Sequence, residues 1–178
     1  MRSAGLIAAA CLFIGCALPR TSSRADAGRV QLHVPFFPDD TDQCGPSALA
    51  SILGYWGKPA EPAELKKEIY RARLKGALTV DLLLAAESRG LPVEMVNGTL
   101  ARVKTELDAG RPLIAYVNVG FRFYPIGHYL VLTGYDDERG VLFAHSGLER
   151  DRSISYKAFD AQWEKTERWA LLIRPPQA

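Results

Sequence analysis

The amino-acid sequence predicts an α+β domain, in which helices from the first half of the chain pack on an antiparallel sheet from the second half. Two patterns support this fold class. Between residues 44 and 109, apolar side chains recur mainly at three- and four-residue steps, as on one face of a helix. After residue 113 they fall into short β-rich runs that are separated by turn residues. The length of 178 residues suits one domain with a short appendage, and we expect the domain to span residues 30–178.

The first expected helix begins at Cys44, and the rest of the chain is organised around it. Its apolar residues follow the helical period, at Leu49, Ile52, Leu53 and Trp56. Pro46 falls in the first turn, where a missing N–H costs nothing, and Gly57 is a typical helix stop. We therefore expect a buried helix that starts at Cys44 and ends before Gly57.

The same patterns predict the remaining elements. We expect helices over residues 62–73, 78–88, 99–109 and 156–165, with Thr79 as the N-cap of the second of these and Gly90 and Gly110 as stop signals. Extended segments are expected over residues 30–35, 92–96, 113–119, 128–135, 141–144 and 169–174. Residues 136–140 are expected to form the hairpin turn between two of these strands.

The N-terminus has the pattern of an export signal. Arg2 precedes an apolar run over residues 4–18, which is too short for a stable membrane-spanning helix and suits a signal-peptide core. Residues 13–16, Phe-Ile-Gly-Cys, resemble the bacterial lipobox, whose cysteine is lipidated. We expect a signal peptide over residues 1–18, lipidation of Cys16 and a flexible tether over residues 19–29. The alternatives are a cut after Ala27 and a plain secretory signal without lipid.

The expected location is therefore the envelope of a bacterium, where the lipid on Cys16 holds the domain at a membrane. Ala17, which follows the cysteine in place of Asp, favours the periplasmic side of an outer membrane. A secreted protein is the alternative.

Charge and cysteine content exclude several classes of function. The net charge of +2 and the interspersed charges indicate neither nucleic acid nor an acidic polymer as partner. Cys11 lies in the signal and Cys16 is the expected lipid site, so Cys44 is the one cysteine of the mature domain and no disulfide can form within it. A zinc-finger type of metal site needs several Cys or His residues at short spacing, so we expect neither a metal nor a cofactor.

Cys44 and His128 are the candidate catalytic pair. At a helix N-terminus, unpaired N–H groups and the helix dipole lower the pKa of a thiol toward the reactive thiolate. His128 opens an apolar strand, where a general base can face a cleft from a rigid element. The alternatives are a small buried apolar residue for Cys44 and a core or edge histidine for His128. His33 is interpreted as a surface or packing residue. A lone cysteine at a helix start and a histidine at a strand start form the arrangement of a thiol peptidase.

Two stretches resemble a known family. Residues 43–50, Gln-Cys-Gly-Pro-Ser-Ala-Leu-Ala, and residues 127–136, Gly-His-Tyr-Leu-Val-Leu-Thr-Gly-Tyr-Asp, are similar to the bacteriocin-processing peptidases of double-glycine leaders, cysteine peptidase family 39 of the papain clan. The resemblance covers about residues 30–175 and is closest to stand-alone, exported members without the ATP-driven transporter, so no nucleotide is expected as partner. It implies a papain-like fold, Cys44 as nucleophile, His128 as general base and a peptide or protein substrate.

The oxyanion-hole position departs from the family pattern. The family has a glutamine five or six residues before the cysteine, and its side chain helps to form the oxyanion hole. This chain has Pro38 and Asp39 there. The Asp39 carboxylate opposes a developing oxyanion, which leaves the backbone N–H of Cys44 and the side chain of Gln43 as candidate donors.

The third triad position also departs from the pattern. The family has an aspartate or asparagine sixteen or seventeen residues after the histidine, which corresponds to Ala144 or His145. His145 is the candidate to orient His128, without the negative charge that stabilises an imidazolium, and Ser146 is another candidate.

The sequence therefore indicates an envelope-anchored thiol hydrolase that cleaves peptide or amide bonds. The altered positions keep a second hypothesis open, a catalytically degenerate domain of the same fold that binds peptides without cleaving them. The residues Phe121, Phe123, Tyr124 and Pro125 precede His128 and are expected either to line a substrate groove or to form a packed loop.

Overall fold

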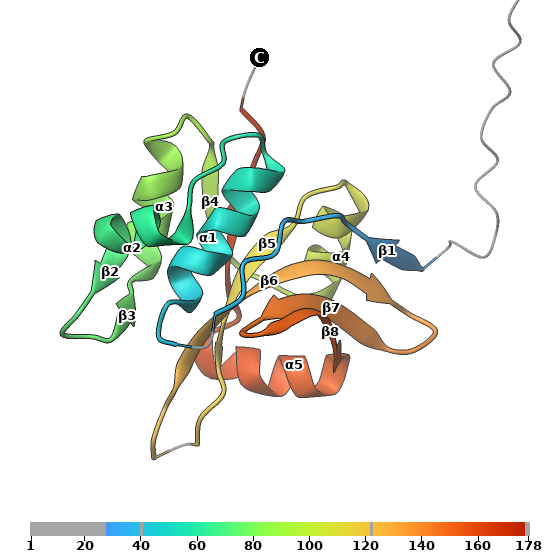
Figure 1. Cartoon of the computed structure of the whole chain (residues 1–178). Helices are drawn as coiled ribbons and strands as arrows, with labels where there is room; N and C mark the ends of the chain where they lie inside the picture. Colours follow the sequence, from blue (N-terminus) through green and yellow to red (C-terminus); the bar gives the residue numbers. More distant parts are fainter. Residues whose placement is uncertain (1–27, 40, 122, 177–178) are drawn as a thin grey trace, which may run out of the picture.

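The computed structural model describes residues 28–39, 41–121 and 123–176, and these residues form the α+β fold that the sequence predicts (Figure 1). The expected signal peptide, the expected lipidation site at Cys16 and residues 19–27 of the expected tether lie outside the described residues. Gly28 and Arg29, the last residues of that tether, join the sheet, because the Asp137 N–H donates to the Gly28 carbonyl at 2.8 Å and Arg29 begins the first strand.

Seven strands of the described residues form one antiparallel sheet, in the order β4-β9-β5-β6-β7-β8 with β1 paired to β6. The strands are β1 Arg29–Gln31, β4 Val93–Asn97, β5 Leu113–Asn118, β6 Gly127–Asp136, β7 Val141–Ser146, β8 Glu149–Ser155 and β9 Trp169–Ile173. The expected turn between β6 and β7 is confirmed, with the Gly140 N–H donating to the Asp137 carbonyl at 3.3 Å and Gly140 at a φ of 63°.

Helices cover both faces of this sheet, as Figure 1 shows. On one face lie α1 Cys44–Tyr55, α2 Pro62–Ile69 and α3 Thr79–Glu87, and on the other lie α4 Leu100–Asp108 and α5 Tyr156–Trp163, which a 3₁₀ turn over Glu164–Thr166 follows. Side chains alternate along the central strands, so Ile114 of β5 packs toward α1 while Leu113 and Ala115 pack toward α4 and α5. Because both faces are covered, the central strands read as continuous apolar runs.

The helix that carries Cys44 is buried along most of its length. Leu49, Ile52 and Leu53 are completely buried, as their spacing predicts. The helix ends at Tyr55, and Gly57 adopts a φ of 70°, the left-handed conformation of a helix stop.

Two helix boundaries differ from the sequence-based expectation. The helix expected to reach residue 73 ends at Ile69, because Tyr70–Arg71 (β2) pair with Gly76–Ala77 (β3) as a separate two-stranded hairpin. Thr79 is the first residue of α3 and not its N-cap; Leu78 occupies the N-cap position and its side chain makes no capping bond.

Strand β8 is not among the strands that the sequence predicts. Its charged residues 149–152 do not show the apolar pattern of a buried strand. The strand lies at the edge of the sheet beyond β7, where charged side chains protect an exposed edge from pairing with other chains. No helix in the described ranges is both long enough and apolar enough to cross a membrane.

Candidate active site

Cys44 is the first residue of α1, at the point where this helix meets the start of β6. The N-cap residue, Gln43, makes no side-chain capping bond, and backbone N–H groups of Cys44, Gly45 and Tyr129 interact with the Cys44 thiol. A Cβ atom on Gly45 would lie 2.9 Å from the Cβ atom of Ala77, closer than such atoms approach. Glycine after the cysteine therefore allows the helix start to pack against its neighbours and holds the thiol beside β6.

The pKa of the Cys44 thiol is raised, which corrects the expectation of a lowered one. Burial is the largest cause, and the Asp39 carboxylate raises this pKa further. The N–H groups of Tyr129, Gly45 and Cys44 act in the opposite direction and do not compensate. In the resting protein the sulfur is therefore held as a neutral thiol at physiological pH.

His128 lies at the start of β6, opposite Val117 of β5, and is half-buried. Its Nε2 atom lies 3.0 Å from the Ser146 hydroxyl oxygen. Burial lowers the pKa of His128, Arg152 lowers it further, and Asp39 acts in the opposite direction. The imidazole is therefore neutral at physiological pH and able to accept a proton.

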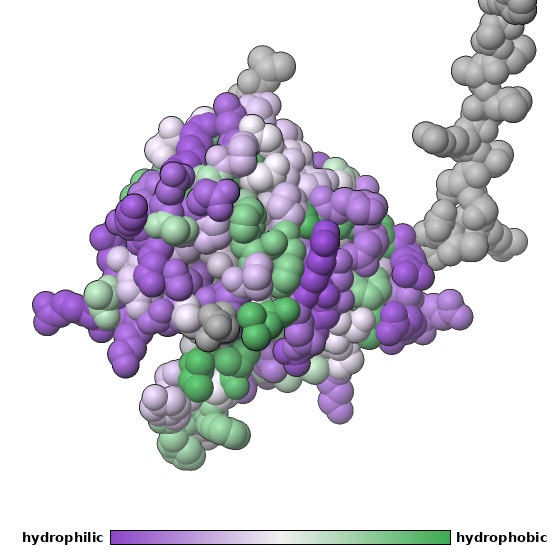
Figure 2. All heavy atoms as spheres, in the orientation of Figure 1, coloured by the Kyte–Doolittle hydropathy of each residue, from purple (hydrophilic) through white to green (hydrophobic). Residues whose placement is uncertain are grey.

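Cys44 and His128 line the same groove. The groove has a volume of about 670 Å³ and runs between the start of α1, the β2–β3 hairpin and the segment that leads into β6. Exposed apolar side chains form part of its wall, at Leu74, Leu78, Val119, Tyr124 and Ile126. Figure 2 shows apolar surface gathered in the lower part of the view, between the start of α1 and the projecting connection from β5 to β6.

The four residues expected before His128 divide into two groups. Tyr124 and Pro125 line the groove, whereas Phe121 and Phe123 do not. Reciprocal backbone hydrogen bonds of 3.1 and 3.0 Å join Phe121 and Tyr124 in a tight turn, and the side chains of Phe121 and Phe123 are 81% and 93% exposed. The turn is therefore not a packed loop.

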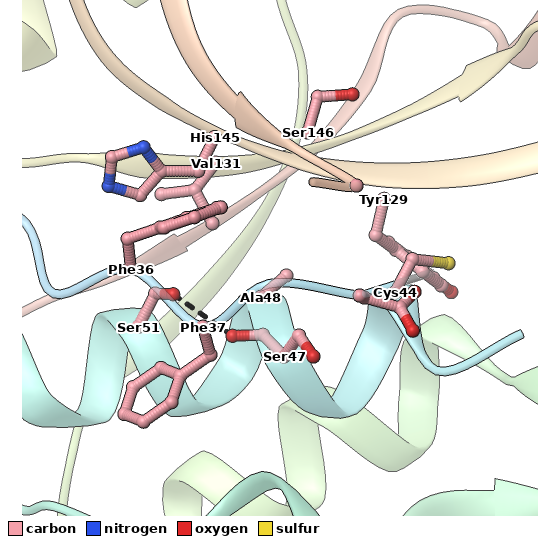
Figure 3. A pocket seen from close by; sticks show the side chains of 12 residues that line it. Phe36, Phe37, Cys44, Ser47, Ala48, Ser51, Tyr129, Val131, His145 and Ser146 are labelled. Atoms are coloured by element: carbon pink, nitrogen blue, oxygen red, sulfur yellow. Dashed lines mark hydrogen bonds between the residues drawn. The ribbon is translucent and has the colours of Figure 1, made fainter. Parts of the chain in front are cut away.

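His145 does not reach His128. The Asp151 N–H donates to His145 Nδ1 at 3.2 Å, so the proton is on Nε2, which donates to the Val34 carbonyl at 3.0 Å. The buried ring also meets the edge of Phe36 at a centroid distance of 5.1 Å, and Figure 3 shows it beside Phe36 and away from Cys44. The structure therefore places Ser146, and not His145, as the partner of His128.

The sequence could not distinguish these two candidates by counting residues. A bulge between Leu132 and Gly134 shifts the register of β6 against β7, so that His145 lies opposite Val131. Adjacent residues of a strand point to opposite faces, and a shift of one residue therefore exchanges their roles.

The side chains of Gln43 and Asp39 lie near the expected oxyanion hole, and their contacts differ. The Gln43 side-chain amide donates to the Thr41 hydroxyl at 2.8 Å. Asp39 lines a small cavity beside Cys44, with a volume of about 20 Å³, which is space for one water molecule. The backbone N–H of Cys44 at the helix start is the donor that remains for a developing oxyanion.

His33 is exposed, as expected for a surface residue. In the part of the chain that the structure describes, no group of three or more His, Cys, Asp or Glu side chains is arranged to hold a metal ion.

Three solved structures that share this fold illustrate the likeness. The peptidase domain of Streptococcus ComA, a bifunctional ABC transporter of a quorum-sensing pathway, is 22% identical with a TM-score of 0.66, covering 80% of this chain and 99% of that chain. A double-glycine motif protease from an AMS/PCAT transporter, in complex with its leader peptide, is 21% identical with a TM-score of 0.66, covering 82% and 94%. A C39-like peptidase from Bacillus anthracis is 17% identical with a TM-score of 0.66, covering 84% and 99%.

At these identities the likeness shows the fold. No curated protein matches the sequence. The profile of the peptidase C39-like family matches residues 28–171, which include Cys44, His128 and Ser146. The chain therefore belongs to the peptidase C39-like family.

Proposed function

We propose that this chain is a thiol peptidase of the cell envelope, which hydrolyses peptide or amide bonds with Cys44 as nucleophile and His128 as general base. The observation that carries the proposal is that both residues line one open groove while the Ser146 hydroxyl holds His128 Nε2 at 3.0 Å. A nucleophile, a base and a group that orients the base are the parts that acyl transfer requires.

The pKa directions favour general-base catalysis over a preformed ion pair. With Nε2–H donating to Ser146, the Nδ1 atom of His128 accepts the Cys44 proton as the sulfur attacks the substrate carbonyl. The resulting imidazolium then gives this proton to the leaving amine as the C–N bond breaks, which leaves an acyl-enzyme. A water molecule, deprotonated by His128, hydrolyses the thioester and regenerates the thiol.

The walls of the groove favour a peptide with apolar side chains near the scissile bond. The wall residues Leu74, Leu78, Val119 and Ile126 expose apolar surface that a bound peptide can cover. The related double-glycine motif protease was crystallised with a leader peptide. We propose an extended peptide, or an exposed segment of a protein, as the substrate.

A second candidate is a degenerate peptide-binding module on the same fold. It is favoured by the raised pKa of Cys44 and by the Asp39 carboxylate at the position that the resemblance assigns to an oxyanion donor. Such a module retains the groove and loses turnover.

Incubation of the purified protein with a mixture of synthetic peptides, followed by mass spectrometry, separates the two candidates. The peptidase proposal predicts new termini that appear with wild type and disappear with Cys44→Ala and with His128→Ala, while both variants keep the wild-type melting temperature. Binding of peptides by wild type, without any cleavage that depends on Cys44, would support the binding module instead.

We further propose that lipidation of Cys16 anchors the domain at a bacterial membrane, with the periplasmic side of an outer membrane favoured. The expected lipobox at residues 13–16 supports this proposal. Expression in a bacterial host with labelled palmitate, followed by membrane fractionation, tests it. The label and the membrane association should both be lost in Cys16→Ala, and an unlabelled, freely released wild-type protein would favour secretion.

A further inference from the structure

Asp39 is placed where it can act on the chemistry of Cys44. Both residues line the small cavity at the start of α1. The Asp39 N–H donates to the Gly147 carbonyl at 3.0 Å, which ties this residue to the segment that follows Ser146. The N–H and the hydroxyl of Thr41 both donate to Asp39 Oδ1, at 3.1 and 2.9 Å. These contacts fix the carboxylate beside the nucleophile.

In the described part of the chain, no cation pairs with this carboxylate. Among the ion pairs of the described residues none includes Asp39, whose partners in Thr41 are neutral donors. The basic residues of the neighbouring strand β8 have other partners, since Arg150 pairs with Asp151 at 3.8 Å and Arg152 with Glu149 at 3.3 Å. A half-buried, fixed and unpaired carboxylate attracts a cation from solution or from a ligand.

An unpaired negative charge at this place opposes each anionic species of the proposed reaction. Thiolate formation at Cys44 and the oxyanion of the tetrahedral intermediate both place a second negative charge near Asp39. The same carboxylate raises the pKa values of Cys44 and His128, so its field reaches both members of the pair. A positive group on the substrate cancels this repulsion, whereas a neutral substrate does not.

We propose that Asp39 is a specificity-determining residue, which makes the site selective for ligands that carry a positive charge beside the bond under attack. The ligand chemistry is an ammonium or guanidinium group, supplied by a Lys or Arg side chain or by a free α-amino group of a peptide. This proposal rests on the proposed peptidase function for its biological meaning, and the charge selectivity of the site is measurable without any turnover.

The decisive experiment compares thiol reagents of similar size and different charge. The full chain is treated with ethylammonium, neutral and ethylsulfonate methanethiosulfonates, and the modification rate of Cys44 is followed by mass mapping of its peptide. Wild type should react faster with the cationic than with the anionic reagent, and Asp39→Asn should reduce this rate ratio by about tenfold.

Asp81→Asn is the matched control. The Asp81 carboxylate lies outside the groove and pairs with the Arg71 guanidinium at 2.5 Å, so this variant removes a charge that a cation already neutralises. It should keep most of the wild-type ratio. Asp39→Ser retains an acceptor for Thr41 and serves as a second neutral variant with a different side chain. A ratio that is the same in wild type, Asp39→Asn and Asp39→Ser would overturn the proposal.

Paired peptides identify the source of the positive group. Peptides that differ by Lys against norleucine beside the scissile bond, and by a free against an acetylated N-terminus, are compared in wild type and Asp39→Asn. A preference for one charged member that disappears in Asp39→Asn supports that source, and equal cleavage of both pairs by wild type counts against the proposal. If no peptide is cleaved by any variant, the peptidase function fails, while the reagent ratio still decides the role of Asp39.

Discussion

The Nε2 atom of His128 lies 3.0 Å from the hydroxyl oxygen of Ser146, across neighbouring strands of the sheet. A serine hydroxyl orients an imidazole, but it adds no negative charge to stabilise the imidazolium that forms during acyl transfer. Ser146, His128 and Cys44 are thus all neutral at rest. In such a site, charges form only when the thiol attacks the substrate.

Removal of the Ser146 hydroxyl should slow catalysis. Ser146→Ala frees the imidazole to rotate, and we expect kcat to fall by about 10–10²-fold, less than the roughly 10²–10⁴-fold that general acid–base catalysis contributes as a whole, with a smaller change in KM. Ser146→Asp should raise the pKa of His128, because a carboxylate favours the charged imidazole. The pH profile of kcat/KM checks both variants.

Ser153→Ala, at an exposed position of β8, is the matched control and should behave as wild type. Equal kcat values for Ser146→Ala and wild type would show that the hydroxyl does not orient His128.

The choice of a partner for His128 shows which features of this site can be predicted from the sequence and which cannot. The two strands, the turn between them and His128 at the start of the first follow from local patterns of apolar and turn residues. The choice between His145 and Ser146 depends on how the bulge at Leu132–Gly134 shifts the register, and this shift is a property of the two paired strands. The helix start at Cys44 follows from local patterns in the same way. The pKa of its thiol does not, because burial by residues distant in sequence outweighs the effect of the helix N-terminus.

Alkylation of Cys44 should report a thiol and not a thiolate. Because burial and Asp39 raise the pKa of this group, the rate with iodoacetamide should be low at pH 7 and should rise with pH beyond about 8.5, the usual value for a free cysteine. His128→Ala should lower the rate at neutral pH further, since it removes the proton acceptor. Labelling is followed from pH 5 to 10 by mass spectrometry of the Cys44 peptide. An apparent pKa well below 8.5 would instead demonstrate a preformed thiolate–imidazolium pair.

Stability should decrease in mild acid because His128, which is half-buried, and His145, which is buried, resist protonation. Burial lowers the pKa values of His128 and His145, so between these values and about 6.5, the unperturbed value, the unfolded chain binds more protons than the folded one. Their contribution to stability is therefore complete above about pH 6.5 and is lost as the pH falls below it. Melting temperatures at pH 7.5 and 5.0 measure this loss, at about 2–4 °C for each kcal/mol.

A histidine variant separates this effect from general acid destabilisation. His145→Gln should show a smaller difference in melting temperature between the two pH values than wild type, whatever its absolute stability. His33→Gln, which changes an exposed histidine, should keep the wild-type difference. A wild-type melting temperature that is the same at pH 7.5 and 5.0 would contradict the neutral state assigned to both imidazole rings.

Gly134 should be intolerant of a side chain, because β1 pairs closely with β6 at this residue. A Cβ atom there would lie 2.1 Å from the Val30 carbonyl oxygen and 3.0 Å from the Gln31 Cα atom, and both of these are backbone atoms that cannot rotate away. Gly134→Ala should therefore displace β1 and lower the free energy of unfolding by about 1–3 kcal/mol, the usual cost of overpacking. Since β1 precedes the segment that carries Asp39, the displacement should also speed proteolysis between residues 28 and 43.

Gly76→Ala is the control, as its nearest neighbour is the Leu74 carbonyl oxygen at 3.9 Å, and it should change stability little. Thermal melting with limited proteolysis measures both effects, and equal stability of the two variants would mean that β1 does not hold this part of the fold in place.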